Sequence, residues 1–239
     1  MSYFILTKHA NSDLRNDEQN QLLSLHAKEK VYILPKNNLQ YYVCNGLFEK
    51  GLIEWCKQYC KKDQNMLDIG AHSGTYTISL AEYCHKVYAF EPQKMTYYSL
   101  CGSVVLSGIS NADCLNYGLG TEEQVGKQTL NIISIDGGGS SLHTNEQSNV
   151  LCTEQIEVKT LDSFNIDNIC FIKMDVENNE LQVLMGSVNT LKRSNYPKIL
   201  FEMNQIDKNI IQFLEKLGYN VISINGTNNM FLAVHPKNS

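Results

Sequence analysis

Two acidic residues follow apolar segments of the chain at a spacing that suits a ligand site. Asp68 precedes a turn with two glycines in NMLDIGAHSGTYTISLAE (residues 65–82), and Glu91 lies near the end of KVYAFEP (86–92). A dinucleotide site would carry the pattern G-x-G-x-x-G and hold a pyrophosphate against the next helix. The spacing here differs, and Asp68 would bring negative charge close to a pyrophosphate. We therefore expect a ligand with positive charge, such as an ammonium or a sulfonium group.

Glu91 extends this prediction to a nucleoside. An acidic residue about 20 residues beyond such a turn accepts the hydroxyl groups of an adenosine ribose. A ribose joined to a cationic amino-acid tail describes S-adenosylmethionine, and Gly70 and Gly74 would allow a tight turn and a close backbone approach. The structural alternative is that the glycines only turn the chain, Asp68 caps the next helix and Glu91 is a solvated strand end. We favour the ligand site because these residues occur together.

A third group of ionisable residues lies in IKMDVENNE (172–180). Alternate residues of a strand point to one face, so Lys173, Asp175 and Glu177 would share a side while the chain stays extended. At the carboxyl end of a parallel strand they would line the ligand crevice. Methyl transfer from a sulfonium to a hydroxyl requires alignment and removal of a proton. Asp175 could take that proton, and Lys173 could orient it or stabilise an oxyanion; the alternative is a salt-bridged pair that only fixes the strand.

Further side chains could complete this site. Glu177, Glu180 and Glu202 could bind other hydroxyl groups of an acceptor, or a divalent cation through hard oxygen ligands. For Glu180 the structural alternative is a favourable charge at a helix start. His72 could act as a base because the pKa of imidazole lies near neutrality, and a structural or solvent-exposed histidine is its alternative. The sequence leaves metal dependence open.

The elements that would position these residues alternate along the chain. From Met66 onward, apolar strands alternate with amphipathic helices, which indicates a parallel sheet covered by helices on both faces. We predict a Rossmann-like α/β domain over residues 61–239 and a small N-terminal cap over residues 1–60. Residues 120–160 interrupt the alternation and carry a Gly-Gly-Gly-Ser-Ser turn. An insertion of this length predicts a lid.

Four segments carry more detailed predictions. VYILPKNNLQYYVC (31–44) is predicted as two strands around a turn. LFEKGLIEWCKQYCKK (47–62) and ELQVLMGSVNTLKR (180–193) are each predicted as a helix. ADCLNYGLG (112–120) is predicted as the third strand of the sheet.

Composition argues against several classes of partner. The 239 residues include 43% hydrophobic and 19% charged residues and carry a formal net charge of -5, which gives no sign of a basic surface for nucleic acid. No apolar run approaches the ~20 residues of a membrane helix, and no signal-peptide pattern is visible. We expect a cytoplasmic protein whose eight cysteines are reduced. Cys56 and Cys60 share a helix face, and we interpret them as buried apolar residues rather than half of a zinc site.

The motifs together resemble a known family. LDIGAHSGTYTISLA, VYAFEPQ, LNYGLG, GGGSSL, VKTLDSF, FIKMDVENNELQVLMGS, ILFEMN and LGYNVISINGTNNMFLAVH resemble the FkbM-type methyltransferases, a branch of the class I S-adenosylmethionine-dependent enzymes. The resemblance covers about residues 47–235. The sequence departs from the family at His72, where Asn is usual, at Asn178, where Gly is usual, and at Gly118, where Ala is common.

The resemblance implies a class I methyltransferase fold and assigns roles by motif. It implies that the glycine turn and Glu91 hold S-adenosylmethionine and that Lys173 to Glu180 lie beside the transferred methyl group. The predicted cofactor contacts are Asp68, Gly70, Ala71, Gly74, Glu91, Asn116 and Asp175. The predicted catalytic residues are Asp175, Lys173 and His72, and the predicted acceptor contacts are Glu177, Glu180 and Glu202.

The predicted function is S-adenosylmethionine-dependent O-methylation of a small-molecule or glycan hydroxyl, with a sugar favoured by the resemblance. Three alternatives stay open: an N-methyltransferase, a binding module that keeps the adenosyl pocket without catalysis, and an NAD-dependent oxidoreductase on the same fold. The missing G-x-G-x-x-G pattern and Asp68 argue against the last. The sequence does not identify the acceptor or the oligomeric state.

Overall fold

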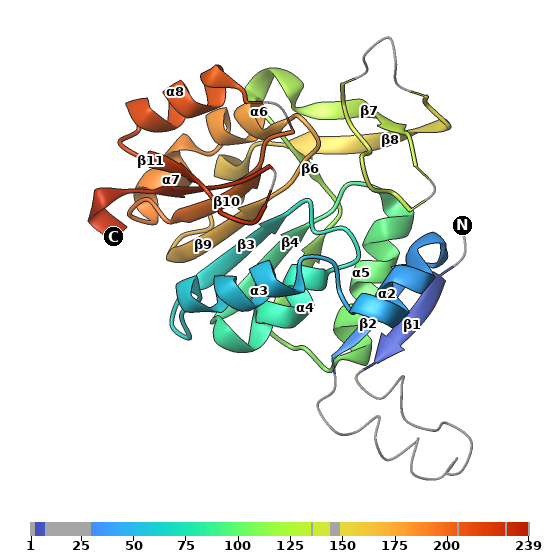
Figure 1. Cartoon of the computed structure of the whole chain (residues 1–239). Helices are drawn as coiled ribbons and strands as arrows, with labels where there is room; N and C mark the ends of the chain where they lie inside the picture. The colour runs from blue at the N-terminus through green and yellow to red at the C-terminus, as the bar shows by residue number, and fades with distance from the viewer. Residues whose placement is uncertain are drawn as a thin grey trace, which may run out of the picture.

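The computed structural model describes residues 3–7, 30–134, 136–143, 149–204, 206–227 and 229–238. These residues form a central seven-stranded sheet flanked by helices, with two smaller sheets beside it (Figure 1). Within them, no helix is long and apolar enough to cross a membrane. All eight cysteines are described, and all are free thiols.

The central sheet has the strand order β11-β12-β10-β9-β3-β4-β5. Its members are β3 (Asn65–Ile69), β4 (Lys86–Phe90), β5 (Ala112–Leu115), β9 (Ile169–Met174), β10 (Lys198–Glu202), β11 (Asn220–Ser223) and β12 (Met230–Val234). Its five neighbouring strands β10, β9, β3, β4 and β5 are parallel. Strand β12 is antiparallel to both β10 and β11. The carboxyl ends of β3, β4 and β9 therefore meet at one edge of the sheet, which is where ligands bind in open α/β sheets.

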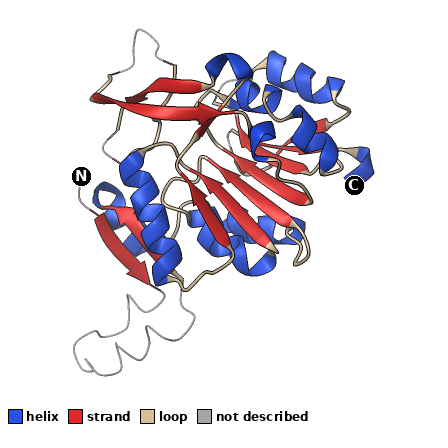
Figure 2. Ribbon diagram, turned by 180° about the vertical axis from the view of Figure 1, so that it is seen from behind, coloured by secondary structure: helices blue, strands red, loops and turns tan. Residues whose placement is uncertain are grey.

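Helices cover both faces of this sheet (Figure 2). They are α3 (Lys50–Cys56), α4 (Thr75–Leu80), α5 (Lys94–Leu106), α6 (Glu180–Met185), α7 (Val188–Arg193) and α8 (Lys208–Lys216). Strand β3 is buried along its whole length: Leu67 and Ile69 belong to a buried cluster with Val183 of α6, and Met66 belongs to another with Tyr76 of α4. A strand covered on both faces has no solvent side, so its sequence does not alternate.

Two small sheets flank the central one. Strands β1 (Tyr3–Thr7) and β2 (Val31–Pro35) form an antiparallel hairpin, and Ser103 and Ser107 of α5 accept backbone N–H bonds from β2. Strands β6 (Gly118–Leu119), β7 (Gly126–Ile132) and β8 (Cys152–Lys159) form the second sheet. The remaining helical segments are α2 (Leu39–Asn45) and the 3-10 turns η1 (Lys36–Asn38), η2 (Lys57–Tyr59), η3 (Ala81–Tyr83), η4 (Glu122–Gln124), η5 (Leu161–Phe164) and η6 (Pro236–Asn238). The predicted domain boundary at residue 60 stays a prediction.

Three predicted elements were wrong. The second predicted strand of residues 31–44 is helix α2, whose Tyr42 is buried. The predicted third strand divides into β5 and β6, which belong to different sheets. The predicted helix 180–193 breaks into α6 and α7 at Gly186, because a Cβ there would lie 2.0 Å from the carbonyl oxygen of Gly120. In each segment a tertiary contact outweighs the local pattern.

Candidate active site

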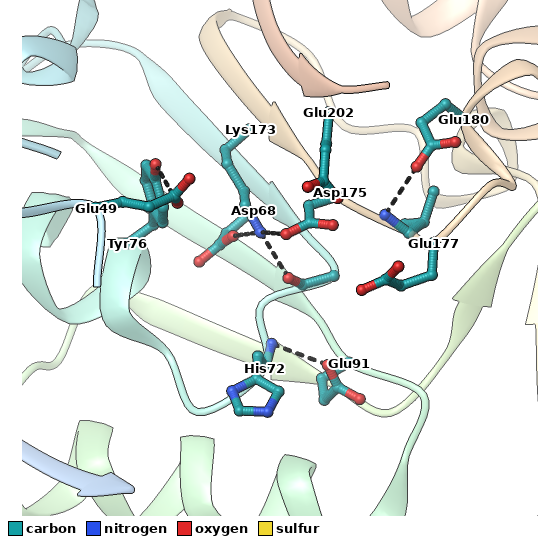
Figure 3. A network of polar contacts seen from close by, with 12 residues as sticks. Glu49, Asp68, His72, Tyr76, Glu91, Lys173, Asp175, Glu177, Glu180 and Glu202 are labelled. Carbon is teal, nitrogen blue, oxygen red and sulfur yellow. Dashed lines mark hydrogen bonds and ion pairs between the residues drawn. The ribbon is translucent and has the colours of Figure 1, made fainter. Parts of the chain in front are cut away.

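A cleft of 390 Å³ opens at the carboxyl edge of the sheet. Its walls come from the ends of β3, β4 and β9, from helices α2 and α4, and from the loop after β7. Figure 3 shows the ionisable residues of this region, with Lys173 at the centre and Glu49, His72, Glu91, Asp175 and Glu177 around it. The three acidic segments that the sequence singled out are thus brought together.

The glycine turn between β3 and α4 has the backbone that its sequence predicts. Gly70 and Gly74 have φ angles of +74° and +88°, a region that residues with a Cβ rarely occupy. A Cβ on Gly70 would lie 1.8 Å from the carbonyl oxygen of Asp175, and one on Gly74 would lie 2.6 Å from Leu100 Cδ1. The backbone that comes close to Gly70 is therefore that of the chain just after β9. Gly70 and Ala71, which donate backbone N–H bonds to the Phe90 carbonyl, both line the cleft.

Asp68 lies beneath the cleft rather than in its wall. Its side chain is fully buried, and Oδ2 accepts bonds from Thr77 N (2.9 Å) and Thr77 Oγ1 (2.6 Å). It therefore anchors the first turn of α4, as the structural alternative anticipated. Oδ1 lies 3.9 Å from Lys173 Nζ, so Asp68 influences the site through its ion pair with that lysine. Its direct contact with a cofactor stays a prediction that this geometry does not favour.

Glu91 is buried and lines the cleft just after β4. Its Oε2 accepts the backbone N–H of His72 at 2.9 Å, and its Oε1 accepts that of Gln93 at 2.9 Å. A carboxylate oxygen can accept a second hydrogen bond, so each oxygen keeps the capacity to bind a ligand hydroxyl. Burial raises the pKa of Glu91 to about 7 despite these donors. Asn116 lies outside the cleft wall and donates to the backbone carbonyls of Glu91 and Pro92, so it holds the segment that carries the carboxylate.

His72 lies in the turn itself with a φ of +50°, a region that Asn, the residue usual in the family, tolerates better than most. Its Nε2 is 2.8 Å from the carbonyl oxygen of Asp136. Burial lowers the pKa of His72, so the ring is neutral near pH 7 and Nε2 is the donor to that carbonyl. This bond ties the turn to the loop above it and occupies the nitrogen that faces that loop.

Lys173, which is buried, and Asp175, which is half-buried, form an ion pair at the end of β9. Lys173 Nζ donates to the carbonyl oxygen of Gly70 at 2.8 Å and lies 3.5 Å from Asp175 Oδ2. Burial alone would lower the pKa of Lys173, but Asp175 and Asp68 outweigh it and raise that pKa. Lys173 is therefore a fixed cation rather than a base. Asp175 lines the cleft, and its Oδ1 is buried beside the Glu202 carboxyl, with no other hydrogen-bond partner in the described part of the chain.

Two glutamates stand beside Asp175. Oxygen atoms of Asp175, Glu177 and Glu202 lie within 4.8 Å of one another. Burial and the charge of Asp175 raise the pKa of Glu202 to about 8 and also raise that of Glu177. The extension of β9 ends at Met174, and Glu177 has a φ of +53°, so a turn rather than strand alternation brings it to Asp175. Glu202 lies at the end of β10, next to Asp175 in Figure 3.

The Glu180 side chain holds the turn after β9 in place. Its Oε1 accepts the backbone N–H groups of Val176 (3.2 Å) and Asn178 (3.3 Å), and the residue is 5% exposed. Asn178, where the family usually has Gly, has a φ of +74°, which Asn can adopt. Burial raises the pKa of Glu180 to about 7. Glu180 does not line the cleft, so its predicted contact with an acceptor stays a prediction.

The loop from Asp136 to His143, here called the lid loop, closes over the cleft. Asp136 Oδ2 accepts bonds from the amides of Asn37 and Asn38. Four further bonds join the lid loop to the site: Gly139 N to Glu177 Oε1 (2.9 Å), Ser140 Oγ to Gln93 Oε1 (3.0 Å), Ser141 Oγ to the Glu177 carbonyl oxygen (2.5 Å), and His143 Nε2 to Asn179 Oδ1 (2.9 Å). The predicted lid insertion over residues 120–160 thus includes a loop that lines the cleft, although its function as a lid stays a prediction.

Several residues of this region escaped prediction. Asn179 is buried, lines the cleft and also donates to the carbonyl oxygen of Leu119. Glu49 and Tyr76 line the opposite wall and share a hydrogen bond of 2.9 Å, and Asp136 belongs to the lid loop. For Asp136, the adjacent Gly-Gly-Gly turn was a signal in the sequence. The other three residues had no local signal, because their contacts join segments far apart in the chain.

The fold and cleft define the class of protein: a Rossmann-like α/β domain with a ligand cleft at the carboxyl edge of its sheet. An FkbM methyltransferase from Methylobacillus flagellatus KT aligns with 78% of this chain at a TM-score of 0.53 and 19% identity. The alignment covers 46% of that protein, so this chain spans about half of its length. A precorrin-6y C5,15-methyltransferase from Geobacter metallireducens GS-15 aligns with 79% of this chain and 90% of its own, at a TM-score of 0.50 and 12% identity. At these identities the two structures support the fold alone.

Sequence comparison identifies the family. The family model described as the methyltransferase FkbM domain matches residues 68–221, which is more than half of the chain. This chain therefore belongs to the FkbM methyltransferase family, as its motifs suggested. Comparison with curated proteins gives no match.

Proposed function

We propose that this methyltransferase transfers the methyl group of S-adenosylmethionine to a hydroxyl group of a sugar or glycan. The observation that carries the proposal is that Glu91 and the Lys173–Asp175 pair open into one cleft beside the glycine turn. The cofactor supplies an electrophilic methyl group on a positively charged sulfur. The residues of this chain must bind it, align the acceptor and accept one proton.

The residues fit the proposed cofactor. Glu91 offers one free acceptor position on each carboxylate oxygen, which suits the two hydroxyls of a ribose. Gly70 and Ala71 present a surface without long side chains along the same wall. The carboxyl groups of the cleft favour a ligand with positive charge. Asp68 acts in this proposal by holding Lys173 and α4 in place.

Asp175 is the proposed base. A carboxylate oxygen of Asp175 would accept the proton of the acceptor hydroxyl as that hydroxyl oxygen forms its bond to the methyl carbon and the sulfur–methyl bond of the cofactor breaks. Lys173 Nζ, 3.5 Å from Asp175 Oδ2, keeps Asp175 oriented. His72 is a weaker candidate because its Nε2 is held by Asp136. Glu177 would bind a further hydroxyl group of a sugar, whereas the contact of Glu202, which does not line the cleft, stays a prediction.

A divalent cation is the other occupant that Asp175, Glu177 and Glu202 could accept, since three hard oxygen ligands suit Mg²⁺ or Ca²⁺. Turnover with and without a chelator separates the two roles. The eight free cysteines support a reducing, cytoplasmic setting. The acidic lining of the cleft argues against nucleic acid as the acceptor.

An acceptor screen with methyl-labelled S-adenosylmethionine tests the proposal. Sugars with free hydroxyl groups should receive the label in an alkali-stable ether. Label found on nitrogen would favour the N-methyltransferase. Cofactor binding without transfer to any acceptor would favour the binding module, and binding of NAD would favour the oxidoreductase.

A further inference from the structure

The charges of the cleft are strongly unbalanced. Five carboxyl groups line it, from Glu49, Glu91, Asp136, Asp175 and Glu177, and Lys173 is the only lysine or arginine among its described lining residues. Lys173 is already paired with Asp175, Asp68 and the Gly70 carbonyl. The cleft therefore has no free cation in the described part of the chain with which to bind a phosphate or a carboxylate.

Arginine, the side chain best suited to phosphate, is almost missing from the sequence. The chain has two arginines. Arg15 lies outside the described residues, and Arg193 on α7 bonds to Thr190 and to the Ile166 carbonyl, away from the cleft wall. This composition disfavours an acceptor activated by a nucleoside diphosphate as well as a nucleic acid.

Not all five carboxylates are available to an acceptor. Asp136 is occupied by the two asparagine amides and by Ser134 and Gly138, and Glu91 is assigned above to the ribose. Glu49 and Asp175 remain on opposite sides of Lys173, as Figure 3 shows, with Glu177 beyond Asp175. A cofactor with one net positive charge does not balance this set.

Aromatic rings accompany Glu49. Tyr42, Phe48 and Tyr76 line the same part of the cleft wall. Phe48 is 38% exposed and packs edge-on against Tyr42 with 5.0 Å between ring centroids. Tyr76 donates its hydroxyl to Glu49 Oε2 and so fixes the carboxylate. Aromatic faces beside a carboxylate bind organic ammonium groups, whereas a metal ion would be bound by oxygen ligands alone.

We propose that the acceptor is a polyhydroxylated amine, such as an amino sugar, whose ammonium group binds between Glu49 and the rings of Tyr42 and Phe48. The hydroxyl that receives the methyl group then lies at Asp175, on the far side of Lys173. This inference rests on the proposed function and specifies its substrate class. The proposed acceptor is thus a cationic sugar rather than a neutral one, because the negative charge of the cleft, and not hydroxyl binding alone, selects the ligand.

The test compares two ligands that share their hydroxyl groups and differ in charge. Neamine, a small amino sugar, and its fully N-acetylated derivative are titrated by calorimetry into the full chain saturated with S-adenosylhomocysteine. Neamine should bind at least about tenfold more tightly than the acetylated form, and added salt should weaken its binding. Equal affinity for the two ligands, tighter binding of the acetylated form, or no binding of either would overturn the proposal.

A variant then tests the assigned residue. Glu49→Gln keeps an acceptor for the Tyr76 hydroxyl while it removes the charge, and it should weaken neamine binding about tenfold without changing the affinity for S-adenosylhomocysteine. Glu54→Gln, on helix α3 just after Glu49, is the control, because Glu54 is exposed, pairs with Lys57 and does not line the cleft. Weaker S-adenosylhomocysteine binding in Glu49→Gln would assign Glu49 to the ammonium of the cofactor and overturn the proposal. Failure of the unmodified chain to bind S-adenosylhomocysteine would instead contradict the proposed function itself.

Discussion

Glu91 is the residue whose replacement should change cofactor binding most directly. Each of its oxygens accepts one backbone N–H in the free protein and can accept one ribose hydroxyl. Bonds of this kind to a carboxylate contribute about 1 to 3 kcal/mol in all. Glu91→Ala should therefore raise the dissociation constant for S-adenosylhomocysteine by about 5-fold to 150-fold.

The same residue predicts how binding depends on pH. Burial raises the pKa of Glu91 to about 7, and the hydroxyl groups of the ligand favour the ionised form. As the pH falls from 8 to 6 the free carboxyl becomes protonated, and affinity should fall about tenfold. Glu91→Gln cannot titrate, so its weaker affinity should be nearly constant over this range.

Calorimetric titration at several pH values measures both effects. Glu215→Gln is a matched control, because Glu215 is exposed on α8 and does not line the cleft. Circular dichroism should show that each variant is folded. Unchanged affinity in Glu91→Ala, or the same pH dependence in Glu91→Gln and the unmodified chain, would refute the assignment of Glu91 to the ribose.

Three further substitutions test other parts of the site. Asp175→Asn should leave the chain folded, as circular dichroism would show, while turnover falls about 10²-fold to 10⁴-fold; full turnover would remove Asp175 as the base. Gly70→Ala should unfold the chain at a lower denaturant concentration than Gly126→Ala, because both glycines have a positive φ but only the first has an atom within 2 Å of the added Cβ; equal midpoints would contradict this clash. Burial raises the pKa of Glu180 to about 7, so its stabilising contribution is present below about pH 4.5 and is lost as the pH rises through 7, by about 3 kcal/mol. Denaturation across this range should therefore show a smaller loss of stability in Glu180→Gln, and an unchanged pH profile would contradict that role.

The sequence predicted the parts of the fold that depend on local pattern. The turn at Gly70 and Gly74 and the strands on either side of it follow from apolar runs and from the backbone freedom of glycine. The parallel order brings the ends of those strands together, so the proximity of Glu91 and Lys173 was also predictable. Local pattern sufficed because a buried parallel strand is specified by its own residues.

The rest depends on contacts between distant segments. The helical state of α2 follows the burial of Tyr42, and the break at Gly186 follows its close contact with Gly120. Glu49 meets Tyr76 only after α3 has packed on α4, so no local signal marked it. The position of Asp68 was ambiguous for the same reason: a carboxylate at a strand end can face a ligand or anchor a helix, and only its bonds to Thr77 decide.

The central claim is that this cleft binds S-adenosylmethionine. Titration of the purified chain with S-adenosylmethionine and S-adenosylhomocysteine, with NAD as the control, tests it most directly. The structure predicts saturable binding of both adenosyl ligands at one site and no binding of NAD. Binding of NAD without either adenosyl ligand would contradict the account and favour the oxidoreductase.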